Sequence, residues 1–176
     1  DELKLPQAKY WLEVGSGRHG EQTAKMISEI EKILIKENPN IVLVQGDTNS
    51  VLAGALAAVK LHIKIGHIEA GLRSFDANMP EEINRKLEDH CSDLLFAPTE
   101  IAKQNLINEG IDKNKILVTG NIIVDAVMDA LNIISKDKMN ADEYFLLTLH
   151  RQENVDNKEK LKKIIEGTDK IHKQFG

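Results

Sequence analysis

Apolar positions along the chain follow two alternating periods. Within residues 24–37, isoleucine and leucine recur every three or four positions, which predicts one buried face of a helix that ends at Asn38 and Pro39. Residues 41–44 are a continuous apolar run, typical of a strand covered on both faces. The alternation continues, with helices predicted at 51–61, 81–90, 99–108 and 124–134, and strands at 63–68, 94–96 and 116–118.

The end of the chain repeats this alternation after a polar interruption. Residues 135–143 are polar and aperiodic, and are interpreted as a linker. Residues 144–149 predict a further strand, and the spacing of Asp156 and Glu159 predicts the cap of a last helix. The buried face of that helix is expected to comprise Leu161, Ile164, Ile165, Thr168 and Ile171.

Repeated strand–helix units predict the fold class. They indicate an α/β protein with a doubly wound, Rossmann-like parallel sheet and right-handed crossovers. Such sheets bind ligands at the carboxyl ends of their strands. Functional residues are therefore expected just after Val44, Ile68, Phe96, Val118 and Leu149.

Composition narrows the classes of partner. The net charge of −5 is spread along the chain without a basic block, so a nucleic acid is not an expected partner. The apolar runs are too short for a membrane span, and a single cysteine, Cys91, allows no internal disulfide. These features fit a reducing cytoplasm. No cluster of His, Cys and carboxylate residues has metal-ligand spacing, so no metal is expected.

The segment from Gly15 to Gly20 matches the spacing of a dinucleotide-binding loop. That fingerprint also needs an acidic residue at the end of the next strand, about 20 residues on. Glu37 lies at this distance but at a helix end, and Asp47 at the next strand end comes too late. The motif is therefore interpreted as a loop that leads into the first helix.

Carboxylates follow two of the predicted strands. Asp47 comes after a glycine that permits a tight turn; taken alone, it fits a helix N-cap slightly better than a chemical role. Glu69 ends the next strand and suits a ligand site, or equally an exposed pair with Arg73 worth under about 1 kcal/mol. His67, within the same strand, is interpreted as a hydrogen-bonded core histidine.

Glu81 stands in the first turn of a helix that opens at Pro80. Ordinary helix-start chemistry explains both residues. Against this alternative, a long irregular connection leads to them from Glu69, and structured loops of that kind are often functional.

His150 and Arg151 follow the last predicted strand and precede a helix. A pair of cationic side chains beside the free N–H groups of a helix start is an anion-binding arrangement. The alternative is an exposed loop in which neither residue has a role.

Taken together and in this order, the motifs resemble one enzyme family. They are Val44 to Thr48, His67 to Ser74, Met79 to Arg85, Phe96 to Glu100, Thr119 to Asn121 and Leu149 to Asn154. Over roughly residues 11–165 they resemble the non-hydrolysing UDP-N-acetylglucosamine 2-epimerases. The pair HIEAGLRS and PEEINR is the most specific part of the resemblance.

The resemblance implies a glycosyltransferase-B-like fold, in which two Rossmann-like domains face a cleft. Residues 1–137 would be the later part of the N-terminal domain, and residues 138–176 a linker and the first strand–helix unit of the UDP-binding domain. The family's first strand with its Gly-Thr-Arg-Pro-Glu loop, and most of the second domain, have no counterpart here. The chain is thus expected to be about half an enzyme and not to turn over substrate by itself.

The family reaction is anti elimination of UDP from UDP-N-acetylglucosamine, followed by re-addition with C2 inverted to give UDP-N-acetylmannosamine. The resemblance implies this activity, with no cofactor, with UDP-N-acetylglucosamine and UDP as ligands, and in a homodimer that supplies cell-surface polysaccharide precursors. The implied catalytic residues are Asp47, Glu69, Glu81 and His150, and the implied substrate contacts are Arg73, Arg85, Asn121, Arg151 and Glu153. Which carboxylate takes which proton stays open.

Two alternatives from other classes stay open. One is a glycosyltransferase on the same fold, and the other is a sugar-nucleotide sensor without catalysis. Several carboxylates at strand ends argue against a sensor, because they repel a diphosphate and only a proton-transfer task justifies that repulsion.

Overall fold

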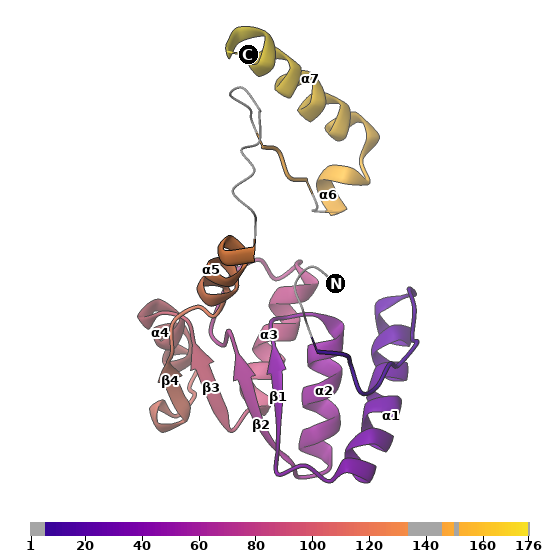
Figure 1. The fold of residues 1–176 in the computed structure, drawn as a ribbon, viewed down its shortest axis with the longest axis vertical. Coiled ribbons are helices and arrows are strands. Elements are labelled where there is room, and N and C mark those ends of the chain that lie inside the picture. The colour runs from indigo at the N-terminus through magenta and orange to yellow at the C-terminus, as the bar shows by residue number, and fades with distance from the viewer. Residues whose placement is uncertain (1–5, 134–145, 150–151, 176) are drawn as a thin grey trace. The chain divides into compact units, whose positions relative to one another are not determined.

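The computed structural model describes residues 6–133, 146–149 and 152–175 (Figure 1). The chain divides into two compact units, Asp1–Ile133 and Ile134–Gly176, and each is described by itself. The domain boundary expected at residue 137 and the linker expected at 135–143 lie outside the described residues. None of the helices in the described ranges is long and apolar enough to cross a lipid bilayer.

The described part of unit 1 is built on a four-stranded parallel sheet. The strands are β1 (Ile41–Gln45), β2 (Lys64–Ile68), β3 (Leu94–Ala97) and β4 (Ile116–Val118), in the order β1-β2-β3-β4. The helices are α1 (His19–Glu37), α2 (Asn49–Lys60), α3 (Pro80–Cys91), α4 (Glu100–Asn108) and α5 (Ile123–Ile133), with a short 3₁₀ turn, η1 (Lys113–Lys115). The predicted α/β class with a parallel sheet is confirmed.

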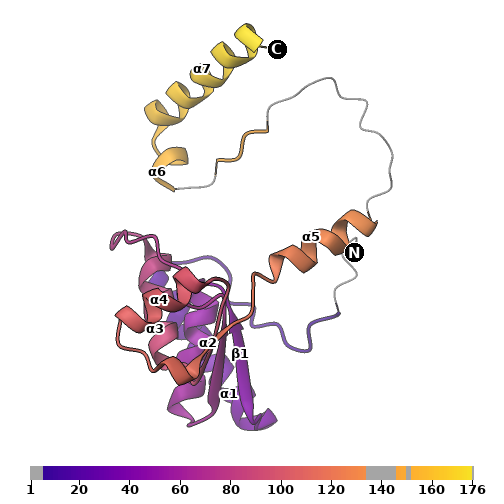
Figure 2. The ribbon, with the colours of Figure 1, turned by 90° about the vertical axis from the view of Figure 1, so that its left-hand side faces the viewer.

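Helices α2, α3 and α4 cover one face of this sheet (Figure 2). Alanines of α2 pack on Val44 and Ile65, and Ala102 and Leu106 of α4 belong to the cluster around Leu95. When parallel strands follow one another in order and each crossover is right-handed, the connecting helices lie on the same face of the sheet. The described residues therefore form one of the two helical layers of a doubly wound sheet.

The opposite face is open in the described structure. Leu43 on β1 is 58% exposed and Leu117 on β4 is 48% exposed. The expectation that residues 41–44 are covered on both faces is therefore wrong for the described residues, because the helices that pack on β1 there all lie on one side.

The end of α1 and the start of α4 are set by the residues that the sequence predicts there. α1 ends where Asn38 takes a left-handed conformation before Pro39 and donates its backbone N–H to the carbonyl of Leu34. α4 begins where the Thr99 hydroxyl accepts a hydrogen bond of 3.1 Å from the backbone N–H of Ala102, as predicted. Helix ends set by local hydrogen bonds were thus predictable from the sequence.

The start of α1 was predicted too late. The helix begins at His19 rather than residue 24, because its first turn is polar and carries no apolar period. The glycine-containing segment before it is a loop, and Gln22 binds the carbonyl of Gly15 there at 2.9 Å. No strand precedes this loop within residues 6–18, which agrees with its interpretation as a lead into the helix.

The described part of unit 2 comprises α6 (Gln152–Val155) and α7 (Lys158–Phe175). Residues 146–149 form no strand, so that part of the predicted strand is wrong; a strand forms only where a neighbour pairs its backbone groups. The cap of α7 is Asn157, whose side-chain oxygen accepts from the N–H of Lys160 at 3.0 Å, and not the predicted Asp156. The predicted apolar face of α7 contains no buried residue.

Gly71 follows β2 at a point of close contact with α4. Its φ is +80°, and a Cβ there would lie 2.3 Å from the carbonyl oxygen of Ala102. Gly110 has a similar φ of +88° but open space around it, so it is a matched control. We expect Gly110→Ala to cost about 1–2 kcal/mol for the left-handed backbone alone, and Gly71→Ala to cost about 1–3 kcal/mol more for the clash.

Denaturant-induced unfolding of the two variants measures this difference. Equal losses of unfolding free energy would show that the loop after β2 moves away from α4 without penalty.

Candidate functional site

The ends of β1 and β2 place two of the predicted residues on neighbouring loops. Gln45 pairs with Ile68 in the parallel register, and the backbone N–H of Gly46 donates to the carbonyl of Ile68 at 3.2 Å. Asp47 follows the first strand and Glu69 the second. The structure therefore brings Asp47 and Glu69 to the same carboxyl edge of the sheet, where such folds bind ligands.

Asp47 is joined to α3 by an ion pair. Its carboxylate contacts the guanidinium of Arg85, which also contacts Glu82 at 3.1 Å. The Asp47 side chain is 34% exposed and that of Arg85 is 12% exposed. The helix N-cap of α2 is Thr48, so Asp47 does not have the capping role that it fitted slightly better when taken alone. Arg85, predicted as a substrate contact, holds a carboxylate in this structure.

Glu82 organises the loop between β2 and α3. It is 1% exposed and accepts hydrogen bonds from the N–H of Ser74 at 2.8 Å, from the Ser74 hydroxyl at 3.0 Å and from the N–H of Phe75 at 3.2 Å. Burial alone would raise the pKa of Glu82, but these bonds and the charge of Arg85 lower it below its usual value. Glu82 is thus a fixed anion beneath the loop.

Sequence reasoning chose Glu81 and missed Glu82. Glu81 is partly exposed in the first turn of α3, the helix whose Asn84 donates to the carbonyl of Asp47 at 2.9 Å. The available signal was the spacing of Glu82 and Arg85, which places an acid and a base one turn apart on the helix.

Glu69 has an unusual backbone conformation. Its φ is +72°, which is rare for a residue other than glycine, and its N–H donates to the carbonyl of Phe96 at 3.2 Å. Among the described residues, no hydrogen bond or ion pair to its side chain is found, and the residue is half-buried. A strained residue at a strand end is a reason to suspect function.

Arg73 does not pair with Glu69. Its side chain is 0% exposed, its guanidinium lies 2.8 Å from Asp89, and its Nε donates to Glu109 at 2.8 Å. The alternative of an exposed Glu69–Arg73 pair is therefore wrong. The prediction that Arg73 contacts substrate finds no support in this arrangement, because the guanidinium is enclosed by protein.

His67 is a fully buried, hydrogen-bonded histidine, as interpreted from the sequence. Its Nδ1 lies 2.7 Å from Asp89 and its Nε2 lies 2.9 Å from the carbonyl of Gly46. Burial alone would lower the pKa of His67, but the hydrogen bond and charge of Asp89 raise it above its usual value. Glu88, also buried, has no hydrogen-bond partner for either carboxyl oxygen in the described structure.

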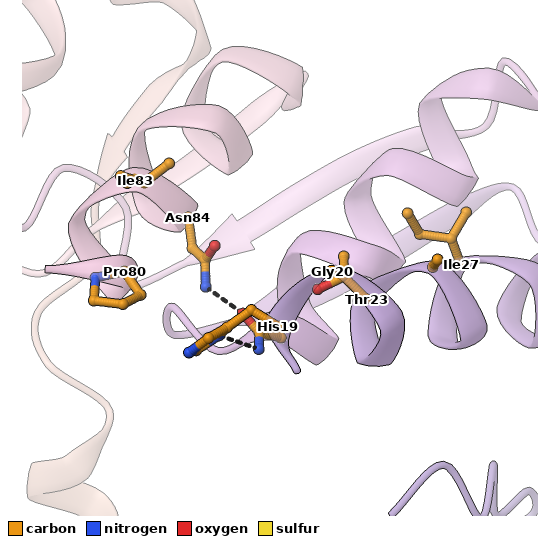
Figure 3. A pocket seen from close by; sticks show the side chains of 9 residues that line it. His19, Gly20, Thr23, Ile27, Pro80, Ile83 and Asn84 are labelled. Carbon is orange, nitrogen blue, oxygen red and sulfur yellow. Dashed lines mark hydrogen bonds between the residues drawn. The ribbon is translucent and has the colours of Figure 1, made fainter. Parts of the chain in front are cut away.

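A pocket of about 430 Å³ is lined by residues of α1, α2 and α3 (Figure 3). Its wall is formed by His19, Gly20, Thr23, Ala24, Ile27, Asn49, Pro80, Ile83 and Asn84. Asn84 donates to the carbonyl of Asp47 at 2.9 Å and to the side chain of Asn49 at 3.2 Å, and Asn49 in turn contacts His19 at 3.0 Å. The apolar pocket thus has one polar edge connected to the site. Sequence reasoning missed it, because three separate helices contribute its wall.

The remaining predicted residues are Asn121, His150, Arg151 and Glu153. Asn121 is exposed after β4, and its side-chain oxygen accepts from the N–H of Ile123 at the start of α5. His150 and Arg151 lie outside the described residues, as does the side chain of Glu153. The helix after them, α6, has only four residues, so the helix dipole in the predicted anion site is weaker than expected. Within the described ranges no group of His, Cys, Asp and Glu could hold a metal ion.

Known proteins resemble the whole described chain. The sequence model of a family described as UDP-N-acetylglucosamine 2-epimerase matches residues 1–175. A UDP-N-acetylglucosamine 2-epimerase of Methanocaldococcus jannaschii is 63% identical, a match that covers 97% of this chain and 49% of that protein. A UDP-2,3-diacetamido-2,3-dideoxy-D-glucuronate 2-epimerase of Pseudomonas aeruginosa is 48% identical, with 97% and 49% covered.

A solved structure agrees with these relatives. The crystal structure of the Methanocaldococcus jannaschii UDP-GlcNAc 2-epimerase, in complex with UDP-GlcNAc and UDP, has a TM-score of 0.93 and 62% identity. The match covers 99% of this chain and 50% of that one. The chain therefore spans about half the length of the relatives that it matches, and the expected fold class is confirmed for that half.

The buried carboxyl of Glu88 generates a prediction about stability and pH. Burial raises its pKa to about 8 from an ordinary value of 4.5, against the opposing charge of His67. Between about pH 4.5 and about pH 8 the unfolded chain has lost this proton while the folded chain keeps it, so the group lowers the free energy of unfolding as pH rises. We expect Glu88→Gln to raise that free energy at about pH 8 by about 1–3 kcal/mol, and by less near pH 4.5.

Equilibrium unfolding across this pH range is the measurement. Glu31→Gln, at an exposed position of α1, is the matched control and should not change the slope. A Glu88→Gln variant with an unchanged slope would show that Glu88 is ionised when buried.

Proposed function

We propose, from the premise that the chain belongs to the UDP-N-acetylglucosamine 2-epimerase family, that it carries the catalytic carboxylates of an enzyme that inverts C2 of UDP-N-acetylglucosamine. The observation that supports this most directly is the placement of Asp47 and Glu69 on adjacent loops at one edge of the sheet. The product is UDP-N-acetylmannosamine, a precursor of cell-surface polysaccharide made in the cytoplasm by a homodimer.

The reaction explains why carboxylates are needed. A base removes the proton from C2, the bond from C1 to the diphosphate oxygen breaks, and UDP leaves an unsaturated 2-acetamidoglucal. UDP then adds back to C1 while an acid returns a proton to the opposite face of C2. Such a reaction needs a proton acceptor and a proton donor on two sides of the sugar ring.

The surroundings of the carboxylates suggest different roles. Asp47 is held by Arg85, so its orientation is fixed. Glu69 is held through its backbone, and its side chain has no partner among the described residues. We infer that Glu69 exchanges a proton with C2, and that Glu81, partly exposed at the start of α3, is the candidate for the other face.

His150 and Arg151 complete the proposal on the side of the leaving group. By resemblance to the family they contact the diphosphate, with Glu153 and Asn121 as further substrate contacts. Negative charge develops on the β-phosphate as UDP departs, and cationic donors stabilise that charge. The names of the two relatives give different substrates, UDP-N-acetylglucosamine and UDP-2,3-diacetamido-2,3-dideoxy-D-glucuronate. The second sugar nucleotide is therefore a further substrate to test.

Deuterium incorporation tests the proton transfer. We use a protein of the relatives' length that contains this chain, called the full-length protein below. In heavy water it should place one deuterium at C2 of both epimers, because the proton leaves and returns. Glu69→Gln and Glu81→Gln should each lower the exchange about 10²–10⁴-fold.

Glu100→Gln is the control, since Glu100 is exposed on α4 and pairs only with Lys103 among the described residues. Epimer formation without deuterium uptake would contradict elimination. Release of UDP that depends on an acceptor would favour a glycosyltransferase, and binding without turnover would favour a sensor.

A second prediction concerns the leaving group. In the full-length protein, His150→Ala should lower kcat about 10²–10³-fold and weaken UDP binding, because one donor to a developing anion is lost. Arg151→Lys should also lower kcat, because the ammonium of lysine cannot replace the planar two-pronged donor of arginine.

Steady-state kinetics with UDP titrations measure both effects, and Lys158→Ala on α7 is the control for a lost positive charge. Unchanged kcat and UDP affinity in both variants would make the segment a connector without a role in the reaction.

A further inference from the structure

The ring of His67 lies between two hydrogen-bond acceptors. Its side chain is 0% exposed, with Nε2 2.9 Å from the carbonyl oxygen of Gly46 and Nδ1 2.7 Å from the Asp89 carboxylate. A carbonyl oxygen only accepts hydrogen bonds, so Nε2 carries a proton.

Asp89 is an ionised carboxylate by the same reasoning. Its second oxygen, Oδ2, lies 2.8 Å from the guanidinium of Arg73 and accepts from the N–H of Gly71 at 3.2 Å. A carboxyl that shares a guanidinium is not protonated, because the positive charge favours the anion. Nδ1 of His67 therefore also carries a proton, and the buried ring is an imidazolium.

The neighbouring charges are consistent with this state. Arg73 is positive and faces both Asp89 and Glu109, so the two cations and two anions balance. Glu88 is the other acidic group against the ring, with its Oε2 3.7 Å from Nε2. Its oxygens have no hydrogen-bond partner in the described structure, which fits a neutral carboxylic acid.

Further charges lie close to Glu88. They are Asp47 and Arg85, whose charges oppose each other; the nearby thiol of Cys91 is neutral, because burial raises its pKa.

We propose that His67 is a positioning residue which, as a buried imidazolium, ties the loop of Asp47 to the loop of Glu69. The tie runs from the Gly46 carbonyl, next to Asp47, through the ring to Asp89, which holds the backbone of Gly71 two residues after Glu69. The importance of this tie for catalysis rests on the proposed function, whereas the charge state and the tie itself do not.

The physical consequence is a dependence of loop geometry on one proton. A neutral histidine can donate from only one of its nitrogens, so losing the proton leaves one ring nitrogen facing an acceptor. Either the Gly46 carbonyl or the Asp89 carboxylate must then move away. Because a shift of about 1 Å at a reacting group can cost about 10²-fold in rate, the loss falls on kcat more than on KM.

The first test reads the protonation state directly. Nitrogen-15 NMR of histidine-labelled, deuterated full-length protein at about pH 8, well above the ordinary histidine pKa of about 6.5, should show both ring nitrogens of His67 protonated. The signals are assigned by their absence in His67→Gln. A ring with one unprotonated nitrogen under these conditions would overturn the proposal, whatever the activity of the His67→Gln variant.

The second test reads the tie. Amide hydrogen exchange at Gly46 and Gly71 should be faster by at least about tenfold in His67→Gln, and kcat lower by at least about tenfold with KM changed much less. A glutamine amide donates on one side only, so it cannot replace the imidazolium.

His90→Gln, at an exposed histidine of the same helix as Asp89, is the control and should change neither quantity. Unchanged exchange at both glycines would refute the tie even if the full-length protein epimerises its substrate. Faster exchange in a protein without epimerase activity would support the tie and count against the proposed function alone.

Discussion

Helix α3 turns three of its charged side chains toward the protein and part of its apolar surface outward, and the geometry of the site depends on this reversal. Glu82, Arg85 and Asp89 recur at helical spacing, and each contacts a loop at the end of β1 or β2. Ile83 and Leu87, on the same helix, are 51% and 46% exposed. An apolar contact would tolerate sliding, whereas directional hydrogen bonds fix the helix against both loops.

Burying these charges is tolerated only because each of them has hydrogen-bond or ion-pair partners that offset the loss of water. Asp89 accepts from His67 and from the backbone of Gly71 and is paired with Arg73, and Glu82 accepts from Ser74 and Phe75. Removing one partner of such a buried pair typically costs about 3–5 kcal/mol, since the other charge is left without compensation. Replacing a whole buried ion pair by apolar residues is often neutral, so we infer that the network fixes the position of the loops more than it adds to stability.

Predictions from the sequence were correct where the residues of one segment determine the structure of that segment. The strands, the cap at Thr99 and the role of His67 as a buried histidine follow from local composition and period. The partners of Arg73 and His67 lie 36 and 22 residues away in the chain, and no local pattern indicates them. The strand predicted after the linker was wrong at 146–149 because a strand requires a partner, which local sequence does not supply.

Asp47 and Glu69 occupy neighbouring loops but are held in different ways. Arg85 fixes the carboxylate of Asp47, so in the proposed reaction this side chain suits a constant electrostatic role. Glu69 is fixed through its main chain: its N–H and that of Ala70 both bind the carbonyl of Phe96 at 3.2 Å. A left-handed conformation at such a residue persists only when its surroundings determine it. In the proposed reaction Glu69 gives and takes a proton, so it has to keep its position while its carboxylate changes charge. Attachment through the backbone holds the residue in place without using the carboxylate.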